Sequence, residues 1–220
     1  MNDLITVIIP AYNGEKYIKE TIDGIKAQNL NTEIIVVDDC STDNTVAIAS
    51  AAGCHVIRHT SNKGQVIGKN TGIRAAQGNY IVFNDQDDIM REGTLSRLLQ
   101  ELKSDPTAEA VMAKSLDFLS PDATINASKA RKDAVWGMFS GATMFRKSTF
   151  DIIGLFDESI KLHTGETIVV QNKMKEHNLI MKKIDYIATN RRIHDNNFGV
   201  TNPEKEYKDY ATVLRARFKK

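Results

Sequence analysis

Short apolar runs alternate with helical segments through residues 1–90, and this alternation restricts the fold more than any other feature of the sequence. Parallel strands that are buried on both faces read as continuous apolar runs, and each needs a crossover helix before the next. The runs are LITVIIP (4–10), EIIVVDD (33–39), HVIRH (55–59) and YIVFNDQDD (80–88). We therefore expect an α/β fold with a Rossmann-like, mostly parallel sheet and helices on both of its faces.

The segments between these runs have the features of helices. Residues 13–28 carry three isoleucines at helical spacing, and residues 41–53 and 68–78 are the second and third helical segments. Asn13 is expected to cap the first helix and Ser41 the second, because short polar side chains accept hydrogen bonds from free backbone N–H groups at helix starts.

The second half of the chain alternates less regularly. Helices are expected over 92–106 and 166–178, strands over 108–120 and 179–194, and a polar loop or lid over 120–135. The tail, 201–220, has the pattern of an amphipathic helix. One face of that helix would be formed by Tyr207, Tyr210, Val213 and Leu214.

Composition and charge exclude several classes of protein. The net charge of +1 does not favour a nucleic-acid binder, which would show a basic excess. Two cysteines without a CxxC pair, Cys40 and Cys54, favour a reducing compartment over a disulfide scaffold or zinc site. The N-terminus lacks the pattern of a signal peptide, and no apolar run approaches the roughly 20 residues that span a bilayer. We expect a cytoplasmic protein, and contact with a membrane surface stays open.

Polar side chains follow the predicted strands at the points where they end. Because the carboxyl ends of parallel strands meet at one edge of a sheet, these side chains should face a common ligand. Three acids lie within four positions, and carboxylates this close repel one another unless they hold a cation. Hard divalent cations such as Mg²⁺ and Mn²⁺ prefer carboxylate oxygens. The polar residues are Tyr12, Asn13, Asp38, Asp39, Asp85, Asp87 and Asp88.

Three segments in this order resemble the family-2 glycosyltransferases with the GT-A fold. The segments are IIPAYNGEKYIKETIDGIKAQ, EIIVVDDCSTDNT and NKGQVIGKNTGIRAAQGNYIVFNDQDD. The resemblance is close over about residues 4–90 and continues more loosely to His194. It implies an inverting transfer of a sugar from a nucleotide-diphosphate donor, most often a UDP-sugar, to a hydroxyl acceptor. The divalent metal, Mn²⁺ or Mg²⁺, would neutralise the charge of the diphosphate leaving group.

The resemblance also implies roles for individual residues. Asp85-Gln86-Asp87 looks like the DxD motif, in which Asp87 would bind the metal directly and Asp85 would contact the ribose, or the metal through water. His194, in the segment RRIHDNN, would be a further metal ligand or contact the diphosphate. The nucleotide-sugar would be bound by Pro10, Ala11, Tyr12, Asn13, Asp39, Ser41, Lys63, Gly64, Lys69, Asn70 and Asp85. The family commonly has arginine where Lys69 stands, and lysine cannot form the same forked contact.

The catalytic base is where the sequence departs from the family pattern. The family usually has a Glu-Asp pair at the start of a helix, and its Asp takes the proton from the attacking hydroxyl. Here Glu166 is present and Thr167 occupies the Asp position. Three explanations compete: Glu166 is the base, the alignment slips by a residue or two, or the activity has been lost. We favour Glu166, although a glutamate also stabilises a helix start through the helix dipole.

Two other kinds of function stay open beside glycosyl transfer. The first is a nucleotide-sugar-binding module without turnover, which Thr167 keeps in consideration. The second is a sugar nucleotidyltransferase or a phosphatase, which the first strand argues against because it lacks a glycine-rich loop and an aspartate nucleophile. A nicotinamide dehydrogenase is disfavoured because no G-x-G-x-x-G motif follows the first strand.

These readings give an expected organisation of the chain. Residues 1–220 would form one glycosyltransferase domain, with the nucleotide-sugar-binding half in 1–90, the acceptor-binding half in 91–200 and the C-terminal helix in 201–220. The acceptor would be a saccharide or a lipid-linked acceptor. The basic end of the tail would rest on anionic lipid as a peripheral membrane contact, pack on a second protomer in a homodimer, or form a solvated helix face.

Overall fold

The first half of the molecule is a regular alternation of strands and helices. The computed structural model describes residues 3–137, 141–158 and 166–217. The elements are β1 (Ile5–Ala11), α1 (Ile18–Lys26), β2 (Thr32–Asp38), α2 (Thr45–Ala51), β3 (His55–Arg58), α3 (Gln65–Ala75) and β4 (Tyr80–Phe83). All strand pairs in the order β3-β2-β1-β4 are parallel. The predicted α/β fold is confirmed.

The second half extends the same sheet with mixed strand directions. Its elements are β5 (Ile89–Met90), α4 (Thr94–Ser104), β6 (Ala108–Leu119), the 3₁₀ turn η1 (Ala127–Lys129), β7 (Val135–Trp136), β8 (Thr143–Arg146), α5 (Thr149–Ile153), α6 (Glu166–Glu176), β9 (Ile180–Ile193), α7 (Phe198–Thr201) and α8 (Pro203–Arg217). The described strands continue in the order β4-β8-β6-β9-β5, with β7 on β6.

Parallel pairing therefore dominates only the first half of the sheet. The strand β8 runs antiparallel to both β4 and β6, and β5 runs antiparallel to β9. The physical reason lies in the connections, because neighbouring parallel strands need a long crossover while antiparallel neighbours do not. Among the described strands of this half, only β6 and β9 pair in parallel, and α5 and α6 lie between them in the chain.

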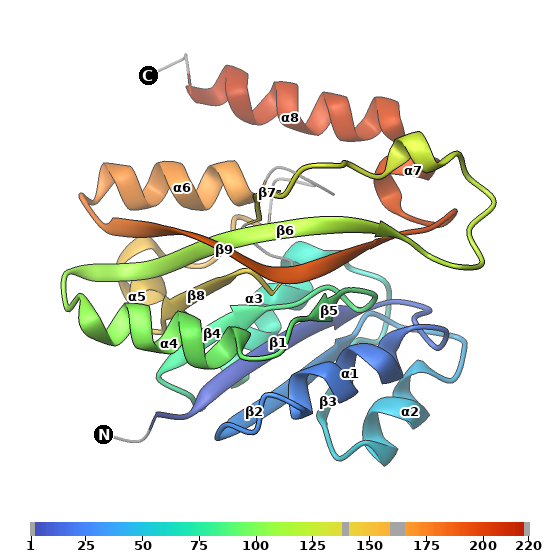
Figure 1. The fold of residues 1–220 in the computed structure, drawn as a ribbon, viewed down its shortest axis with the longest axis horizontal. Coiled ribbons are helices and arrows are strands. Elements are labelled where there is room, and N and C mark those ends of the chain that lie inside the picture. Colours follow the sequence, from blue (N-terminus) through green and yellow to red (C-terminus); the bar gives the residue numbers. More distant parts are fainter. Residues whose placement is uncertain (1–2, 138–140, 159–165, 218–220) are drawn as a thin grey trace.

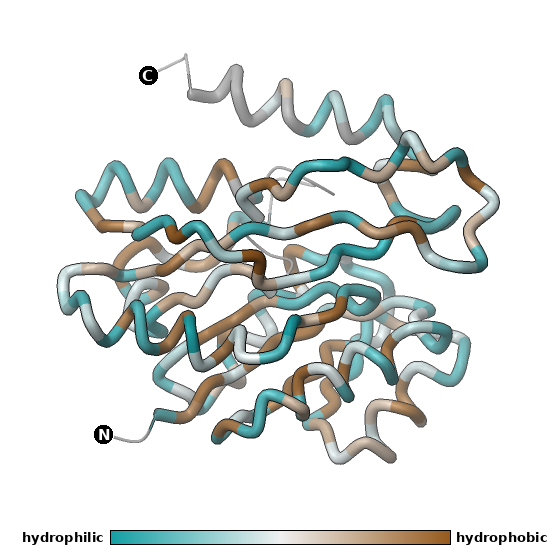
Figure 2. Tube along the Cα trace, in the orientation of Figure 1, coloured by the Kyte–Doolittle hydropathy of each residue, from teal (hydrophilic) through white to brown (hydrophobic). Residues whose placement is uncertain are grey.

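Helices cover both faces of the sheet, as the sequence predicts. On one face α1 and α4 bury their apolar stripes against β1, β2 and β6. On the other face α3, α5 and α6 pack around a cluster of phenylalanines. Figure 1 shows this layered arrangement, and Figure 2 shows hydrophobic positions along the central strands. The buried phenylalanines are Phe83, Phe145, Phe150 and Phe156.

The two predicted helix caps are wrong. The helix α1 begins at Ile18 and α2 at Thr45, so Asn13 and Ser41 stand several residues before the helices. The reason is that the side chain of each residue forms a hydrogen bond with the loop that carries the other residue. The Asn13 backbone N–H donates to Ser41 Oγ at 2.9 Å, and Asn13 Oδ1 accepts from the Thr42 N–H at 2.9 Å. They join the loops that follow β1 and β2.

The strand order has a switch point that defines where a ligand binds. The chain moves from β1 outward to β2 and β3, then returns past β1 to β4 on the other side. In open α/β sheets, ligands bind at the carboxyl ends of the strands where the order reverses in this way. The loops after β1, β2 and β4 carry the polar residues that the sequence singles out.

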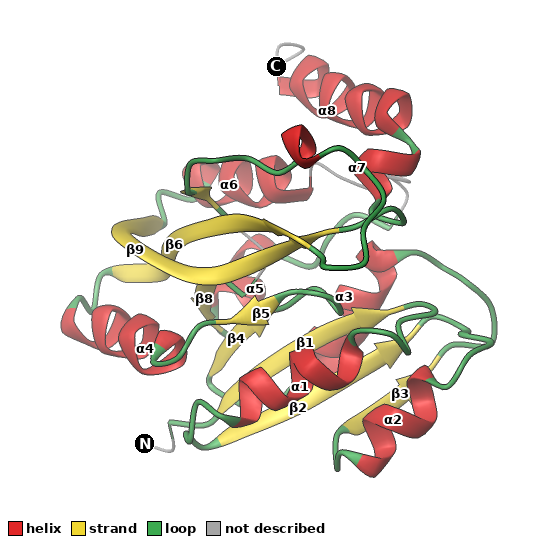
Figure 3. Ribbon diagram, turned by 45° about the vertical axis from the view of Figure 1, so that its right-hand side comes forward, coloured by secondary structure: helices red, strands yellow, loops and turns green. Residues whose placement is uncertain are grey.

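The last helix, α8, follows α7 at the end of the described chain and lies apart from the sheet (Figures 1 and 3). The predicted C-terminal helix is thus present, while its amphipathic packing stays a prediction. Tyr207 is 76% exposed. The side chains of Tyr210, Val213 and Leu214 lie outside the description. In the described part of the chain, no helix has the length and apolar character needed to cross a membrane.

Two helical glycines offer a matched test of the packing between α3 and the sheet. A Cβ placed on Gly72 would lie 2.3 Å from Ile8 Cγ2, whereas a Cβ on Gly24 of α1 would find its nearest neighbour at 3.7 Å. We expect Gly72→Ala to destabilise the protein by about 1–3 kcal/mol through overpacking. We expect Gly24→Ala to be neutral or to stabilise it by up to about 1 kcal/mol through helix propensity. Urea unfolding of both variants measures the difference, and equal stabilities would contradict the close approach of α3 to β1.

Candidate functional site

The acidic segment after β4 is folded into a turn that is fastened to the loop after β1. Asn84 Nδ2 donates to the backbone carbonyls of Asp85 and Asp88, at 2.8 and 3.2 Å. The Gln86 amide pairs with the backbone of Tyr12: Gln86 Oε1 accepts from the Tyr12 N–H at 2.9 Å, and Gln86 Nε2 donates to the Tyr12 carbonyl at 3.2 Å. The middle residue of the DQD motif therefore sets the distance between two predicted donor-binding loops.

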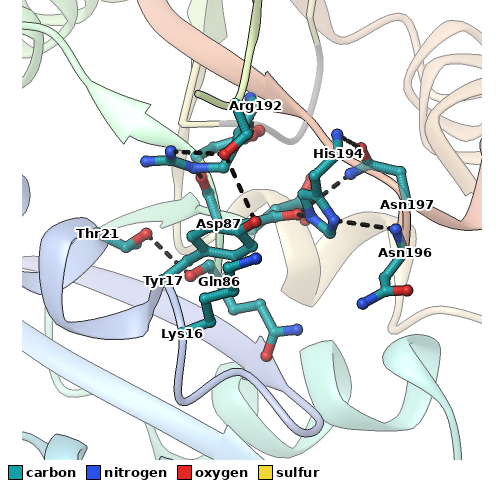
Figure 4. Close-up of polar contacts among 12 residues, drawn as sticks. Lys16, Tyr17, Thr21, Gln86, Asp87, Arg192, His194, Asn196 and Asn197 are labelled. Carbon is teal, nitrogen blue, oxygen red and sulfur yellow. Dashed lines mark hydrogen bonds and ion pairs between the residues drawn. The ribbon is translucent and has the colours of Figure 1, made fainter. Parts of the chain in front are cut away.

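Asp87 and His194 meet at the centre of this site (Figure 4). The distance from His194 Nε2 to Asp87 Oδ2 is 2.8 Å, and Asn197 Nδ2 donates to the same oxygen at 3.3 Å. The backbone N–H of Asn196 donates to His194 Nδ1 at 3.2 Å, so the neutral ring carries its proton on Nε2 and donates it to Asp87. The structure thus brings together two of the three predicted metal ligands, which are far apart in sequence.

Arg192, near the end of β9, also fixes the acidic turn. Its backbone N–H donates to Asp88 Oδ1 at 2.9 Å, and its Nε donates to the Asp87 carbonyl at 3.0 Å. The guanidinium also pairs with Glu20 of α1. Arg192 is 4% exposed, so it supports the turn and is not placed to contact a bound phosphate.

Burial separates the roles of the acids in the turn. Burial raises the pKa of Asp88 well above its usual range, and the nearby Asp87 and Asp85 carboxylates raise it further. Burial also raises the pKa of Asp85, while the Lys69 ammonium opposes that rise. Asp88 is 2% exposed and accepts a hydrogen bond from the Arg192 N–H, so it stabilises the turn from inside the protein.

Asp39 organises the loop that precedes α3. Asp39 Oδ1 accepts from the Lys63 N–H at 2.8 Å, and Oδ2 accepts from the Gly64 N–H at 2.7 Å. His59 Nδ1 lies 2.8 Å from Asp39 Oδ1. Gly64 has a φ of 89°, a conformation that glycine adopts without strain. The contact of Asp39 with a base or ribose stays a prediction, and its role in the structure is to hold Lys63 and Gly64 beside β2.

Lys69 and Glu166 form a buried ion pair between the two halves of the chain. Lys69 Nζ contacts Glu166 Oε1, and the side chains are 2% and 7% exposed. Lys69 comes from α3, and Glu166 is the first residue of α6. Both groups lie within electrostatic range of Asp85. The residue predicted to bind the nucleotide and the residue predicted to be the base therefore lie together next to the acidic turn.

The side chain of Asn70, next to Lys69 in the sequence, forms hydrogen bonds with the second half of the chain. Asn70 Nδ2 donates to the Phe156 carbonyl and to Glu158 Oε1, at 2.8 and 2.9 Å, and Asn70 Oδ1 accepts from the Phe156 N–H at 2.9 Å. Asn70 is fully buried. It positions the segment before α6, and its predicted contact with the nucleotide stays a prediction.

The remaining predicted donor residues lie at the switch point of the sheet. Pro10 and Ala11 end β1, and the Ala11 carbonyl accepts from the Asp39 N–H at 2.7 Å. Tyr12 is 48% exposed, so its ring is open to a ligand. Ser41 is buried and bonded to Asn13, whereas the Lys63 side chain is exposed. Sequence reasoning did not find the role of Gln86, because the middle position of the DxD motif carries no role of its own in the resemblance.

The geometry at Asp87 and His194 fits a divalent cation that is shared with a substrate. Two neighbouring ligands of an octahedral ion with bonds of about 2.1 Å lie about 3 Å apart, close to the 2.8 Å between Asp87 Oδ2 and His194 Nε2. Among the described residues, no group of three or more His, Cys, Asp and Glu side chains could hold a metal alone.

The comparisons with known proteins identify the family. The profile described as Glycosyl transferase family 2 matches residues 6–157. Glycosyltransferase GlyG of Streptococcus pneumoniae is 31% identical over 223 residues, which is 90% of this chain and 73% of GlyG. The chain belongs to glycosyltransferase family 2, as its sequence motifs predict.

Solved structures confirm the GT-A fold. The structure of S. aureus TarS 1-349 in complex with UDP has a TM-score of 0.68 at 22% identity, and covers 95% of this chain and 64% of that one. The mannosyltransferase PcManGT from Pyrobaculum calidifontis, in complex with GDP-Man and Mn²⁺, has a TM-score of 0.77 at 18% identity. The match covers 98% of this chain and 64% of the PcManGT chain. The chain thus spans about two thirds of the length of these two solved structures.

Proposed function

We propose that the protein is an inverting glycosyltransferase that moves a sugar from a nucleotide-diphosphate donor, a UDP-sugar in the first instance, to a hydroxyl acceptor. The observation that carries the proposal is the convergence of Asp85, the Asp87–His194 pair and the Lys69–Glu166 pair at the switch point of the sheet. Membership of family 2 supports it. Ligands bound to the TarS and PcManGT structures, UDP and GDP-Man, support a nucleotide-sugar donor.

Asp87 and His194 would hold Mn²⁺ or Mg²⁺ on the diphosphate, with Asp85 next to them. The cation would supply Lewis-acid neutralisation of the charge that develops on the leaving group. The protein residues do the positioning: Arg192 and Gln86 fix the acidic turn, and Asn197 orients the Asp87 carboxylate. Because Nε2 donates its proton to Asp87, a metal at Nε2 would need the other neutral tautomer of His194, with the proton on Nδ1.

The nucleotide would lie over the loops after β1 and β2. The exposed Tyr12 ring offers a flat surface for the base, and backbone groups near Asn13 and Asp39 offer hydrogen bonds for the base and ribose. Lys63 and Gly64 stand at the start of α3, where the exposed ammonium of Lys63 favours phosphate. The donor sugar would then extend from the acidic turn toward Glu166.

Glu166 would act as the base that takes the proton from the attacking hydroxyl. It is a carboxylate at the start of α6, beside Lys69 and within electrostatic range of Asp85. A base must lie within hydrogen-bond reach of the acceptor hydroxyl, on the side of the sugar opposite to the leaving group. The side chain of Thr167 is not among those that the structure describes. The assignment of the catalytic base therefore rests on Glu166 alone. The acceptor would be a saccharide or a lipid-linked acceptor that enters from the side of residues 91–200.

Donor turnover tests this function directly. Purified protein is incubated with α-linked UDP-, GDP-, CDP- and TDP-sugars in Mn²⁺, and release of the nucleoside diphosphate is followed with water as the acceptor. Proton NMR of the released sugar should show the β anomer first, because a single displacement inverts the anomeric carbon. An α anomer would contradict the inverting mechanism. Tight nucleotide binding without release, with and without candidate saccharide acceptors, would favour the alternative of a nucleotide-sugar-binding module.

A further inference from the structure

Tyr17 contacts the two side chains that shape the metal site. It comes directly before α1, in the donor half of the chain. Its ring centroid is 4.8 Å from that of His194, and the Arg192 guanidinium carbon lies 4.6 Å from the same centroid (Figure 4). The same guanidinium carbon lies 4.7 Å from the centroid of the Phe118 ring. Arg192 thus contacts two aromatic rings, and Tyr17 contacts both Arg192 and His194.

The contact with Tyr17, whose ring is tilted by 41° to the imidazole, holds a ring that hydrogen bonds alone do not fully orient. His194 Nε2 is hydrogen-bonded to Asp87 and its Nδ1 to the Asn196 N–H, and both hydrogen bonds are made at ring nitrogens. A metal ion at Nε2 would take the place of the first hydrogen bond, and with the ring proton on Nδ1 the second could no longer form. The face of the imidazole then has Tyr17 as its contact from the donor half of the chain.

We propose, on the basis of the function proposed above, that Tyr17 is a positioning residue for the metal ligand His194, so that it controls how strongly a divalent cation strengthens nucleotide binding. Arg192 acts through the same contact, because it stacks on Tyr17 and donates to the Asp87 carbonyl. The contact between Tyr17 and His194 links two parts of the chain. One is the loop after β1, which carries predicted donor residues, and the other is the segment that directly follows β9. Tyr17 would touch neither the nucleotide nor the reacting atoms.

The contacts of the ring and of the hydroxyl group can be separated. Tyr17 Oη makes long contacts, 3.5 Å to Asp122 Oδ1 and 3.5 Å to Ser120 Oγ, which are at the limit of hydrogen bonding, and a side-chain hydrogen bond with Lys16. Phenylalanine at position 17 keeps the stack and loses these contacts. Leucine keeps apolar volume and loses the aromatic face. The role of the ring therefore predicts that phenylalanine preserves the effect and leucine does not.

The test measures metal coupling, the ratio of the nucleotide Kd in EDTA to the Kd in Mn²⁺, by calorimetry with UDP and GDP. For Tyr17→Leu we expect this ratio to fall about three- to tenfold, the range for loss of one aromatic stack. The Kd in EDTA should stay within about twofold. For Tyr17→Phe, and for the control Tyr186→Leu at a tyrosine that bonds to the Glu92 carbonyl, the ratio should match the wild type.

The outcomes distinguish this inference from the proposed function. Wild-type protein without any metal coupling would overturn the inference together with the metal site. Wild-type coupling that Tyr17→Leu leaves unchanged would overturn the inference alone. A uniform loss of affinity in Tyr17→Leu, in EDTA as much as in Mn²⁺, would show a general structural role and also overturn it. A Tyr17→Phe variant as weak as Tyr17→Leu would assign the effect to the hydroxyl and contradict the stacking argument.

Discussion

Replacing Glu166 with glutamine is expected to lower the rate of donor turnover about a thousandfold, because a positioned general base typically contributes 10²- to 10⁴-fold. The amide keeps the shape of the side chain and cannot accept the proton. Nucleotide affinity in Mn²⁺ should stay within about threefold, because the amide keeps the size and polarity of the side chain. The measurement is release of nucleoside diphosphate under single-turnover conditions, together with a calorimetric Kd for the same diphosphate.

The neighbouring Lys69 requires a second variant in this test, since the amide removes the carboxylate that forms an ion pair with Lys69. Glu166→Asp keeps the negative charge beside Lys69 and withdraws the carboxylate by one methylene. It should fold like the wild type and still turn over more than about tenfold more slowly, since proton transfer depends on reach. Glu176→Gln, an exposed change at the other end of α6, serves as the control and should not alter the rate. Wild-type turnover in both Glu166 variants would remove Glu166 as the base.

Replacing Lys69 with methionine is expected to destabilise the protein by about 3–5 kcal/mol, because it leaves the Glu166 carboxylate buried without its partner. Lys69 is 1% exposed and Glu166 is 6% exposed, so solvent cannot screen the remaining charge. Urea unfolding of Lys69→Met, compared with wild type, measures the loss. Lys175→Met, which removes an exposed lysine of α6, should change the stability by less than about 0.5 kcal/mol.

A double variant separates the buried charge from the packing around it. Lys69→Met combined with Glu166→Gln removes both charges and should recover most of the lost stability, because the cost of the single change is an unpaired buried charge. If the double variant is as unstable as the sum of the two single variants, the pair does not interact. The ion pair would then have no role in joining α3 to α6.

The first half of the fold was predictable because its apolar runs and its helical spacings indicate the same alternation of strands and helices. The apolar runs from Leu4, Glu33, His55 and Tyr80 became parallel strands, and the isoleucine stripe of α1 became a buried face. In the second half, the antiparallel direction of β8 follows from its partners and not from a local pattern. The two cap predictions at Asn13 and Ser41 failed because a tertiary contact between loops satisfied those side chains instead.

The site was predictable where a motif marks it and not where distant residues complete it. The DQD motif identified Asp85 and Asp87, and the structure places His194 against Asp87 as the family resemblance implied. The pairing of Lys69 with Glu166 joins residues 97 positions apart, and neither residue carries a signal for the other. Tyr17 and Gln86 act through stacking and through backbone contacts, which leave no spacing rule in a single sequence.

The central claim is that the edge formed by Asp85, Asp87 and His194 binds a nucleoside diphosphate together with a divalent cation. The most direct test is a calorimetric titration of UDP, GDP, CDP and TDP in Mn²⁺ and in EDTA, repeated on Asp87→Ala and on the exposed control Asp185→Ala. We predict that at least one diphosphate binds about tenfold or more tightly with Mn²⁺, that Asp87→Ala abolishes this difference and that Asp185→Ala preserves it. Folded wild-type protein that binds none of the four, or binds them equally with and without metal, would contradict the account.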